Sequence, residues 1–484
     1  MPEISCPLGE AAEKAGKSPA IIGHDLTVSY READRWVSAV ALRLTETGCR
    51  KGERIALLLP NDRIHLILLL ALFRLGAVAC PLNTGVPPKG IKSLLERIGC
   101  SKLILSSDLN LSRALAGLTL LNPYELVGKV PPDHTQPTRE EILLDQPATV
   151  IFTSGSQGRA KAVLHSYGNH YYNAEGSNMN IRLGPGDRWL LTLPLYHVGG
   201  LAILFRCLLG GAAVVLPGQT KEIVELISRY RVTHVSMVPT QLYRILRNQK
   251  DTKRLKGLKA LLMGGAPMTT ALLREASEGG IPLHTSYGLT EMASQVTTTA
   301  TNTPAEKQFT SGKVLNYREV RIAENSEILV RGKTLSLGYV EREQVHLPVN
   351  HHGWFATGDL GQIDSEGYLT VLGRRDNMFI SGGENIHPEE IETALSELSD
   401  IMQALVVPVP DEEFGHRPIA FIQTQKKKID PEAITAELKL LLPGYKIPIA
   451  FYDLPGSMEP ERLKVDRATL KKLALEIGHG QTHQ

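Results

Sequence analysis

The stretch Thr153-Ser-Gly-Ser-Gln-Gly-Arg-Ala-Lys161 decides how the rest of this 484-residue chain is interpreted. It follows the apolar, β-branched run Ala148–Phe152, which predicts a buried strand. Glycines let a backbone approach an anion closely, hydroxyl and amide groups donate hydrogen bonds, and a lysine supplies a positive charge. Together these groups are suited to hold a polyphosphate. The residues that we expect to do so are Thr153, Ser154, Gly155, Ser156, Gly158 and Lys161.

This loop is not a Walker A motif, because its spacing is Gly-x2-Gly-x2-Lys and it lacks the Gly-Lys-Ser/Thr ending. Taken alone, it is equally well explained as a flexible Gly/Ser turn between a strand and a helix. The choice between the two interpretations therefore depends on the rest of the chain.

Composition and charge are those of an ordinary globular protein. The chain is 42% hydrophobic and 21% charged with a formal net charge of +2, so nothing favours a nucleic-acid partner. The most apolar run, 66–73, is far too short to span a bilayer, and the N-terminal residues do not have the pattern of a secretory signal. The five cysteines are scattered without metal-ligand spacing. We expect a cytoplasmic protein with no membrane insertion, and a homo-oligomer stays open.

Apolar runs that alternate with helical stretches predict an α/β fold with two layered subdomains. One series spans about 54–105 and the other about 189–263, and in both of them helix-length segments separate the expected strands. This alternation is typical of βαβ units and parallel sheets. After about Tyr317, short strands and glycine turns predict a small β-barrel-like subdomain, and the rest of the chain predicts a small α+β domain. We expect a large N-terminal domain, 1–375, and a small C-terminal domain, 376–484.

Three further stretches combine strand ends with polar residues. A strand ends and a helix begins at His197 in Leu193–Gly200, although a lone histidine more often packs than catalyses. Met263–Pro267 places glycines after another strand, which alone indicates only a turn. In Ser286–Glu291 a hydroxyl precedes a carboxylate, a pair suited to Mg²⁺ on a phosphate, and Tyr287 could stack on a base.

Two later positions suit nucleotide chemistry. Asp359 follows a strand, as the ribose-binding acid of dinucleotide folds does, and Arg374 could reach a sugar or a phosphate. Lys464 lies near the end of the chain, where most lysines are simply solvated. Each of these signals is weak alone, and their order along the chain is what makes them specific.

In that order, the motifs resemble the acyl-adenylate-forming superfamily of acyl-CoA synthetases, firefly luciferases and peptide-synthetase adenylation domains, over nearly the whole chain. Within it the chain is similar to the o-succinylbenzoate–CoA ligases of menaquinone and phylloquinone synthesis, through the stretches 238–242, 290–296, 381–386, 388–392 and 413–418. Gln157, Ala160 and Leu463 depart from the usual Thr, Pro and Gly. Ala160 removes a rigid turn residue but no phosphate ligand, and Leu463 leaves the late lysine in place.

The resemblance implies two half-reactions. A carboxylate and ATP form an acyl-adenylate and pyrophosphate, and the thiol of CoA then displaces AMP. The implied catalytic residues are Lys464, Thr290, His197 and Glu291, which also binds Mg²⁺. Besides the phosphate loop, the implied nucleotide and CoA contacts are Gly265, Ala266, Ser286, Tyr287, Gly288, Asp359, Arg374 and, near the pantetheine path, Gly383. Asp376 is implied to be the hinge on which a mobile small domain turns between the half-reactions.

The implied acid, o-succinylbenzoate, has an aliphatic carboxylate that is activated and an aromatic carboxylate that is not. A buried carboxylate without partners is very costly, so the aromatic group requires hydrogen-bond donors or a cation. By analogy with the subgroup, the candidates are Arg206, Ser236, Ser294 and Gln295, with Gly199, Gly200 and His197 shaping the wall. A structural salt bridge explains Arg206 equally well.

Other functions stay open at this point. The first alternative is a CoA ligase for another aryl or medium-chain carboxylic acid. The second is a non-catalytic nucleotide-binding homologue, against which the intact Lys464 and Glu291 argue. We do not expect a module that loads a carrier protein, because no Ser-bearing carrier domain follows in the sequence.

Overall fold

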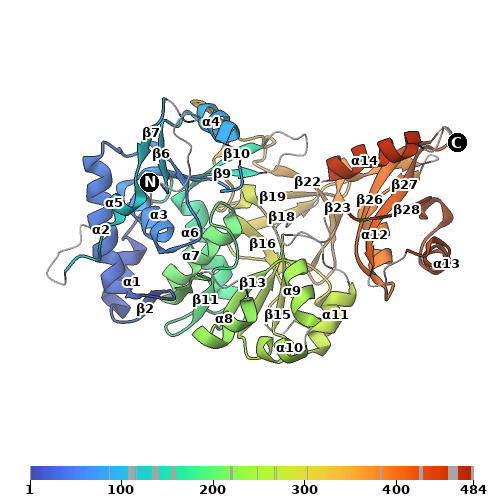
Figure 1. The fold of residues 1–484 in the computed structure, drawn as a ribbon, viewed down its shortest axis with the longest axis horizontal. Coiled ribbons are helices and arrows are strands. Elements are labelled where there is room, and N and C mark those ends of the chain that lie inside the picture. The colour runs from blue at the N-terminus through green and yellow to red at the C-terminus, as the bar shows by residue number, and fades with distance from the viewer. Residues whose placement is uncertain are drawn as a thin grey trace. The chain divides into compact units, whose positions relative to one another are not determined.

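A computed structural model gives the fold and describes residues 2–86, 88–106, 115, 117–132, 141–153, 160–218, 222–247, 249–265, 268, 270–301, 303–381, 384–411, 413–424, 429–455 and 467–480. The chain forms two units (Figure 1). The first contains Met1–Gly265, Gly279–Val320 and Val330–Phe355, and the second contains Ala266–Glu278, Arg321–Leu329 and Ala356–Gln484. A domain boundary between residues 375 and 376 stays a prediction.

The first sheet of the first unit has eight strands in the order β21-β20-β10-β9-β5-β4-β6-β7. Strands β7, β6, β4, β5 and β9 run parallel, whereas β10, β20 and β21 continue the sheet antiparallel. The strands are β4 (Arg54–Leu58), β5 (Val78–Pro81), β6 (Lys102–Leu105), β7 (Thr119–Leu121), β9 (Pro147–Thr153), β10 (Lys161–Ser166), β20 (Gly338–Glu341) and β21 (Gln344–His346).

The second sheet has nine strands in the order β17-β16-β15-β14-β13-β11-β12-β2-β3. The six central strands β15, β14, β13, β11, β12 and β2 run parallel. Strands β16 and β17 extend one edge antiparallel, and β3 extends the other. They are β2 (Pro19–Ile22), β3 (Thr27–Ser29), β11 (Arg188–Leu190), β12 (Ala213–Val215), β13 (His234–Met237), β14 (Ala260–Met263), β15 (Leu283–Leu289), β16 (Ser294–Thr298) and β17 (Lys313–Val314). Both sheets therefore have the predicted parallel strands at their centres, and hairpins add antiparallel strands at the edges.

Helices α1, α2, α3, α5, α6 and α7 pack against these sheets in one large core, and α4 packs against the first sheet in a second core. The central helix α3 is apolar on nearly every side and is almost wholly buried, as a helix without a polar face must be. Helices α2 and α6 begin with capping boxes at Ser29 and Ser166. The helices are α1 (Pro7–Ala15), α2 (Tyr30–Glu46), α3 (Arg63–Leu75), α4 (Pro88–Arg97), α5 (Pro123–Val127), α6 (Tyr167–Asn180), α7 (Val198–Gly210), α8 (Ile223–Tyr230), α9 (Pro239–Leu246) and α10 (Gln249–Leu255).

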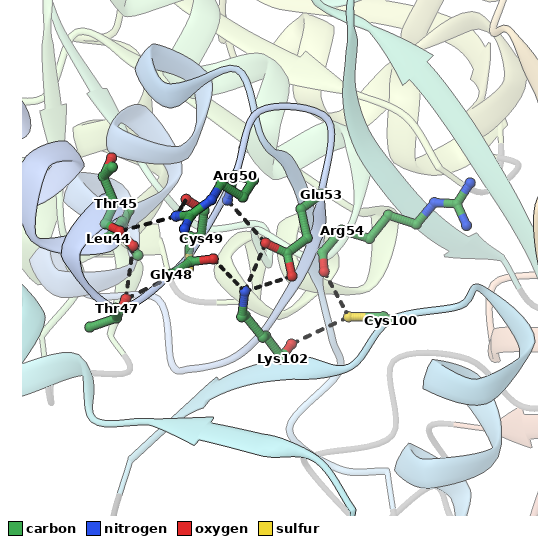
Figure 2. A network of polar contacts seen from close by, with 10 residues as sticks. All are labelled: Leu44, Thr45, Thr47, Gly48, Cys49, Arg50, Glu53, Arg54, Cys100 and Lys102. Atoms are coloured by element: carbon green, nitrogen blue, oxygen red, sulfur yellow. Dashed lines mark hydrogen bonds and ion pairs between the residues drawn. The ribbon is translucent and has the colours of Figure 1, made fainter.

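A polar network joins the end of α2 to β4 and β6 (Figure 2). The ammonium of Lys102 lies 2.7 Å from a carboxylate oxygen of Glu53 and 2.7 Å from the carbonyl oxygen of Gly48. The Cys100 thiol lies 3.1 Å from the carbonyl oxygen of Arg54. All five cysteines are free and buried. These contacts hold neighbouring strands together, so we assign the network a structural role.

In the second unit the C-terminal residues form the predicted α+β arrangement (Figure 1). A three-stranded sheet, β26-β27-β28, packs α12 and α13 against one set of its apolar side chains and α14 against the alternate set. The elements are β24 (Phe379–Ser381), β25 (Glu384–Ile386), α12 (Pro388–Ser396), β26 (Ile401–Asp411), β27 (Gly415–Thr424), α13 (Pro431–Leu441), β28 (Phe451–Asp453) and α14 (Arg467–Gly480).

The region predicted to be rich in short strands forms a four-stranded sheet in the order β18-β19-β22-β23. Its strands are β18 (Arg318–Ile322), β19 (Glu327–Gly332), β22 (Phe355–Ile363) and β23 (Leu369–Arg374). The remaining elements are β1 (Glu3–Ile4), which pairs with β8 (Ile142–Leu143), and α11 (Thr270–Glu278). Among the helices in the described parts of the chain, none is long and apolar enough to cross a membrane.

Candidate active site

The phosphate loop connects two adjacent strands and not a strand and a helix. Thr153 ends β9, Lys161 begins β10, and these two residues face each other in the antiparallel pair. The ammonium of Lys161 lies 4.8 Å from the ring centre of Tyr339. The other expected phosphate ligands, Ser154, Gly155, Ser156 and Gly158, lie outside the described residues.

Thr290 and Glu291 occupy the turn of the β15–β16 hairpin, in the short 3₁₀ helix Thr290–Met292. The turn has a strained backbone, because Ala293 (φ 56°) and Ser294 (φ 134°) adopt positive φ values that side chains disfavour. At Gly288 a Cβ atom would collide with the carbonyl oxygen of Ser294, so the turn requires a glycine there. Strain of this kind is concentrated at functional sites.

Two buried histidines, His165 and His170, belong to a hydrogen-bond network that holds this turn. His165 Nε2 donates a hydrogen bond to the carbonyl oxygen of Thr290 at 2.7 Å. Its Nδ1 lies 3.3 Å from the hydroxyl of Thr149, which also contacts Nε2 of His170 at 2.8 Å. Burial lowers the pKa of His165 to about 4, so the ring is neutral at neutral pH. Because the neutral ring donates from Nε2, its Nδ1 carries no proton and accepts a hydrogen bond from the Thr149 hydroxyl. His165 is therefore the tautomer with its proton on Nε2.

Glu291 is suited to bind Mg²⁺. The hydroxyl of Tyr339 donates to its Oε1 at 2.7 Å, and the other carboxylate oxygen has no protein partner within the described residues. Across those same residues there is no group of three or more His, Cys, Asp or Glu side chains that could form a protein cage for a metal. Mg²⁺ usually takes one or two carboxylates and completes its shell with substrate phosphates and water. A single half-buried carboxylate therefore matches a magnesium ion that arrives with a nucleotide.

The expected nucleotide contacts of the first unit gather at one edge of its second sheet. Strands β13, β14 and β15 run parallel, so Gly265 and Ser286–Gly288 follow or end strands at the same edge. Gly265 has φ 82°, a conformation that favours glycine. Ser286 is half-buried and Tyr287 is buried. Ala266 lies outside the described residues.

Arg206, on α7, is a cation buried in the interior of the first unit. The residue is 1% exposed, and its guanidinium donates to Oε1 of Gln295 at 2.5 Å and lies 5.1 Å from the ring centre of Trp189. No carboxylate in the described part of the chain forms an ion pair with it, so the salt-bridge explanation has no support there. Burial lowers the pKa of Arg206 to about 10, which leaves it charged at neutral pH.

A second buried cation, Arg318, lies beside the first. It is 6% exposed and donates to the carbonyl oxygens of Gln295 at 2.7 Å, Asn316 at 2.6 Å and Asn173 at 3.0 Å. Burial, and to a smaller extent the charge of Arg206, lower its pKa to about 9. Two guanidinium groups therefore give this interior a positive potential that protein carbonyls only partly offset.

The other predicted acid-binding residues join this cluster to different degrees. The indole N–H of Trp189 donates to the hydroxyl of Ser236 at 3.2 Å, and the same indole ring contacts the guanidinium of Arg206. Trp189 therefore links Ser236 to Arg206. Ser294 precedes Gln295 in the strained hairpin. The sequence-based prediction missed Trp189 and Arg318, because each is an ordinary strand residue until folding places it here.

His197 and Gly199 lie at the start of α7, the helix that carries Arg206. His197 is exposed, and its ring centre lies 4.7 Å from that of Tyr196. A Cβ at Gly199 would approach a side-chain carbon of Leu193 to 3.0 Å, and one at Gly200 would collide with the carbonyl oxygen of Pro194. Both glycines therefore allow close packing at this end of the helix.

In the second unit, Asp359 on β22 and Arg374 at the end of β23 face each other in the antiparallel pair. Arg374 Nη1 lies 3.0 Å from Oδ1 of Asp359, and Nη2 lies 4.0 Å from Oδ2 of Asp376. Asp376 lies in a short 3₁₀ helix, Arg375–Asn377, directly after β23. Gly383 and Lys464 lie outside the described residues.

Comparison with known proteins agrees with this organisation. Residues 8–340 match the model of the AMP-binding enzyme family, and residues 390–456 match the AMP-binding enzyme C-terminal domain. The chain belongs to the AMP-binding enzyme family. The resemblance that the motifs indicated and the α/β fold with a large N-terminal and a small C-terminal domain are thereby confirmed.

Among its AMP-binding relatives are 2-succinylbenzoate–CoA ligases. The one from Bacillus pumilus is 34% identical over 467 residues, covering 93% of this chain and 94% of that protein. The one from Escherichia coli is 34% identical over 457 residues, covering 94% and 95%. The fold is similar to o-succinylbenzoate CoA synthetase from Bacillus subtilis in complex with the acyl-adenylate intermediate OSB-AMP, with a TM-score of 0.85, 31% identity and 98% of each chain covered. The same synthetase in complex with ATP and magnesium ion gives a TM-score of 0.83 at 32% identity, covering 94% of this chain and 96% of that one.

Proposed function

We propose that this chain is an ATP-dependent CoA ligase that converts 2-succinylbenzoate to 2-succinylbenzoyl-CoA through an acyl-adenylate, releasing AMP and pyrophosphate, in menaquinone or phylloquinone synthesis. The observation that carries the choice of acid is Arg206, a fully buried guanidinium paired with a neutral amide and an indole. The names of its relatives at 34% identity point to the same acid.

A buried cation without a counter-ion is costly for the folded protein, and a ligand carboxylate removes that cost. Nη2 of Arg206 contacts Gln295, whereas Nε is buried without a hydrogen-bond partner within the described residues. The guanidinium therefore has donor capacity left for an anion. The aromatic carboxylate of 2-succinylbenzoate supplies that anion, and Ser236, Ser294 and Gln295 complete its polar surroundings. A site of this kind rejects an acid that lacks the second carboxylate by orders of magnitude.

The first half-reaction joins the aliphatic carboxylate to the α-phosphorus of ATP. A carboxylate oxygen forms the new P–O bond while the bond to pyrophosphate breaks, so negative charge builds on the departing phosphates. Bound Mg²⁺ would neutralise part of that charge. The carboxylate of Glu291 would hold the ion, Thr290 would donate a hydrogen bond to a phosphate oxygen, and Lys161 with the phosphate loop would bind the β- and γ-phosphates.

Other residues keep the roles that the family resemblance implies. Lys464 neutralises charge at the α-phosphate, Asp359 and Arg374 bind the ribose, and Gly383 is assigned by the resemblance to the path of the pantetheine. In the second half-reaction the CoA thiol gives its proton to water, its sulfur forms the C–S bond, and AMP leaves with the electrons of the broken C–O bond. Asp376 is the hinge of the small domain between the two steps.

The test is pyrophosphate release from ATP and Mg²⁺ with a panel of acids, followed by detection of the CoA thioester. The panel contains 2-succinylbenzoate, 4-oxo-4-phenylbutanoate, benzoate and a medium-chain fatty acid. We expect rapid release of pyrophosphate only with 2-succinylbenzoate. Comparable release with 4-oxo-4-phenylbutanoate, which has the ketone and the aliphatic acid but no ring carboxylate, would contradict the choice of acid. Absence of release with every acid would contradict the enzyme assignment.

A further inference from the structure

Tyr339 is placed by strand pairing beside the lysine of the phosphate loop. On β20 it pairs with Val163 of β10, and Lys161 lies two residues before Val163. Residues two apart on a strand point to the same face, so Lys161 is the diagonal neighbour of Tyr339 across the pair. Its ammonium lies 4.8 Å from the ring centre, within the range of a cation–π contact.

The same tyrosine also reaches the carboxylate that we assign to Mg²⁺. Its hydroxyl donates to Glu291 Oε1 at 2.7 Å. The segment before β20 holds Glu291 through the backbone as well, because the N–H of Ser336 donates to the carbonyl oxygen of Glu291 at 2.7 Å. The short segment 336–339 therefore fixes both the main chain and the side chain of Glu291, while the ring of Tyr339 lies under Lys161.

We propose that Tyr339 is a positioning residue for magnesium–nucleotide binding, orienting the Glu291 carboxylate through its hydroxyl and Lys161 through its ring. This inference rests on the proposed function. A hydrogen bond from outside the metal's own ligands fixes the direction in which a carboxylate presents its free oxygen, and such partners strongly affect metal affinity. The ring restrains a flexible ammonium without neutralising it.

Two variants separate the roles of the hydroxyl and the ring. Tyr339→Phe keeps the ring beneath Lys161 and removes only the bond to Glu291, whereas Tyr339→Leu removes both contacts. Tyr172→Phe is the matched control, because Tyr172 also lies under a lysine ammonium, that of Lys333 at 4.4 Å, and has no place in the proposed site. The thermal unfolding of each variant is compared with that of the wild type.

The readout is calorimetric binding of α,β-methylene-ATP, which resists adenylation, in Mg²⁺ and in EDTA. For Tyr339→Phe we expect the Kd in Mg²⁺ to rise about tenfold and the Kd in EDTA to stay within about twofold of wild type. For Tyr339→Leu we expect the Kd in EDTA to rise as well, by about threefold. Tyr172→Phe should bind as the wild type does in both conditions.

Two results would overturn the inference. In the first, Tyr339→Phe binds the nucleotide in Mg²⁺ as tightly as the wild type. In the second, its binding weakens equally in Mg²⁺ and in EDTA, as general damage to the site would produce. Because nucleotide binding is measured without any acid, failure of the acid panel for the wild type would refute the proposed function and leave this test intact.

Discussion

Replacing Arg206 with methionine is the sharpest test of how the acid is recognised. The substitution removes the charge and its hydrogen bond to Gln295 but keeps an unbranched, apolar side chain of similar reach inside α7. Because Arg206 is only 1% exposed, solvent does not screen the interactions of its guanidinium. The effects on stability and on specificity can therefore be considered separately.

The stability terms nearly cancel. Burial lowers the pKa of Arg206 from 12.5 to about 10, which corresponds to about 3 kcal/mol of cost for keeping the cation folded. Methionine removes that cost. It also removes a hydrogen bond from a charged donor, about 2 kcal/mol, and a contact with the Trp189 ring, about 1 kcal/mol. We expect the free energy of unfolding of Arg206→Met to stay within about 2 kcal/mol of wild type.

The effect on the acid is large, because one partner of a buried charge pair is lost. Such losses cost about 2–5 kcal/mol, so kcat/KM for 2-succinylbenzoate should fall by about 30-fold to several thousand-fold. For 4-oxo-4-phenylbutanoate we expect a change below about threefold, because that acid has no group to pair with Arg206. Pyrophosphate release with both acids, together with urea unfolding, measures the three quantities. An equal loss for both acids, or unfolding weakened by well over about 3 kcal/mol, would refute this role for Arg206.

Three further predictions concern the nucleotide and the buried histidines. Ser154→Ala combined with Ser156→Ala should raise the apparent KM for ATP much more than that for CoA, and steady-state kinetics showing equal effects would count against the phosphate loop. Lys464→Ala should raise the activation free energy of acyl-adenylate formation from acid and ATP by about 3 kcal/mol. The variant should still convert a supplied acyl-adenylate and CoA at nearly the wild-type rate. Equal losses in the two half-reactions would show that Lys464 does not serve adenylation alone. Burial lowers the pKa of His165 to about 4, so the unfolded chain binds a proton that the fold excludes, and stability falls as the pH drops below about 6.5. His165→Gln, which can still donate to the Thr290 carbonyl but cannot titrate, should lose about 2 kcal/mol less than wild type between about pH 7 and pH 5 in urea unfolding.

Local patterns were sufficient for the elements and for the order of the motifs. Buried strands such as β4 and β9 are short apolar runs, and a helix that is buried all round, such as α3, is an apolar run of helical length. The alternation of the two predicted the α/β layers, and the mixture of helices and strands that begins at about Asp376 predicted the α+β region at the C-terminus. These signals are local, because burial imposes its pattern on each segment separately.

Antiparallel edges were not predictable in the same way. The central strands run parallel as predicted, whereas the antiparallel strands β10, β20 and β21 of one sheet and β3, β16 and β17 of the other were not predicted. A hairpin joins an existing edge through backbone hydrogen bonds, which carry no sequence signature. That pairing is nevertheless what places Tyr339 between Lys161 and Glu291.

The sequence by itself determined the family, the expected chemistry and most candidate residues, because those depend on motifs whose order survives without geometry. Only the tertiary structure decided what surrounds Arg206. Gln295 is 89 positions away along the chain, and Trp189 and Arg318 come from other strands. Whether a buried arginine meets a carboxylate or a neutral amide depends on which distant segments pack against it. No local pattern of residues contains that information, since the charge balance of a protein interior is a property of the packed fold.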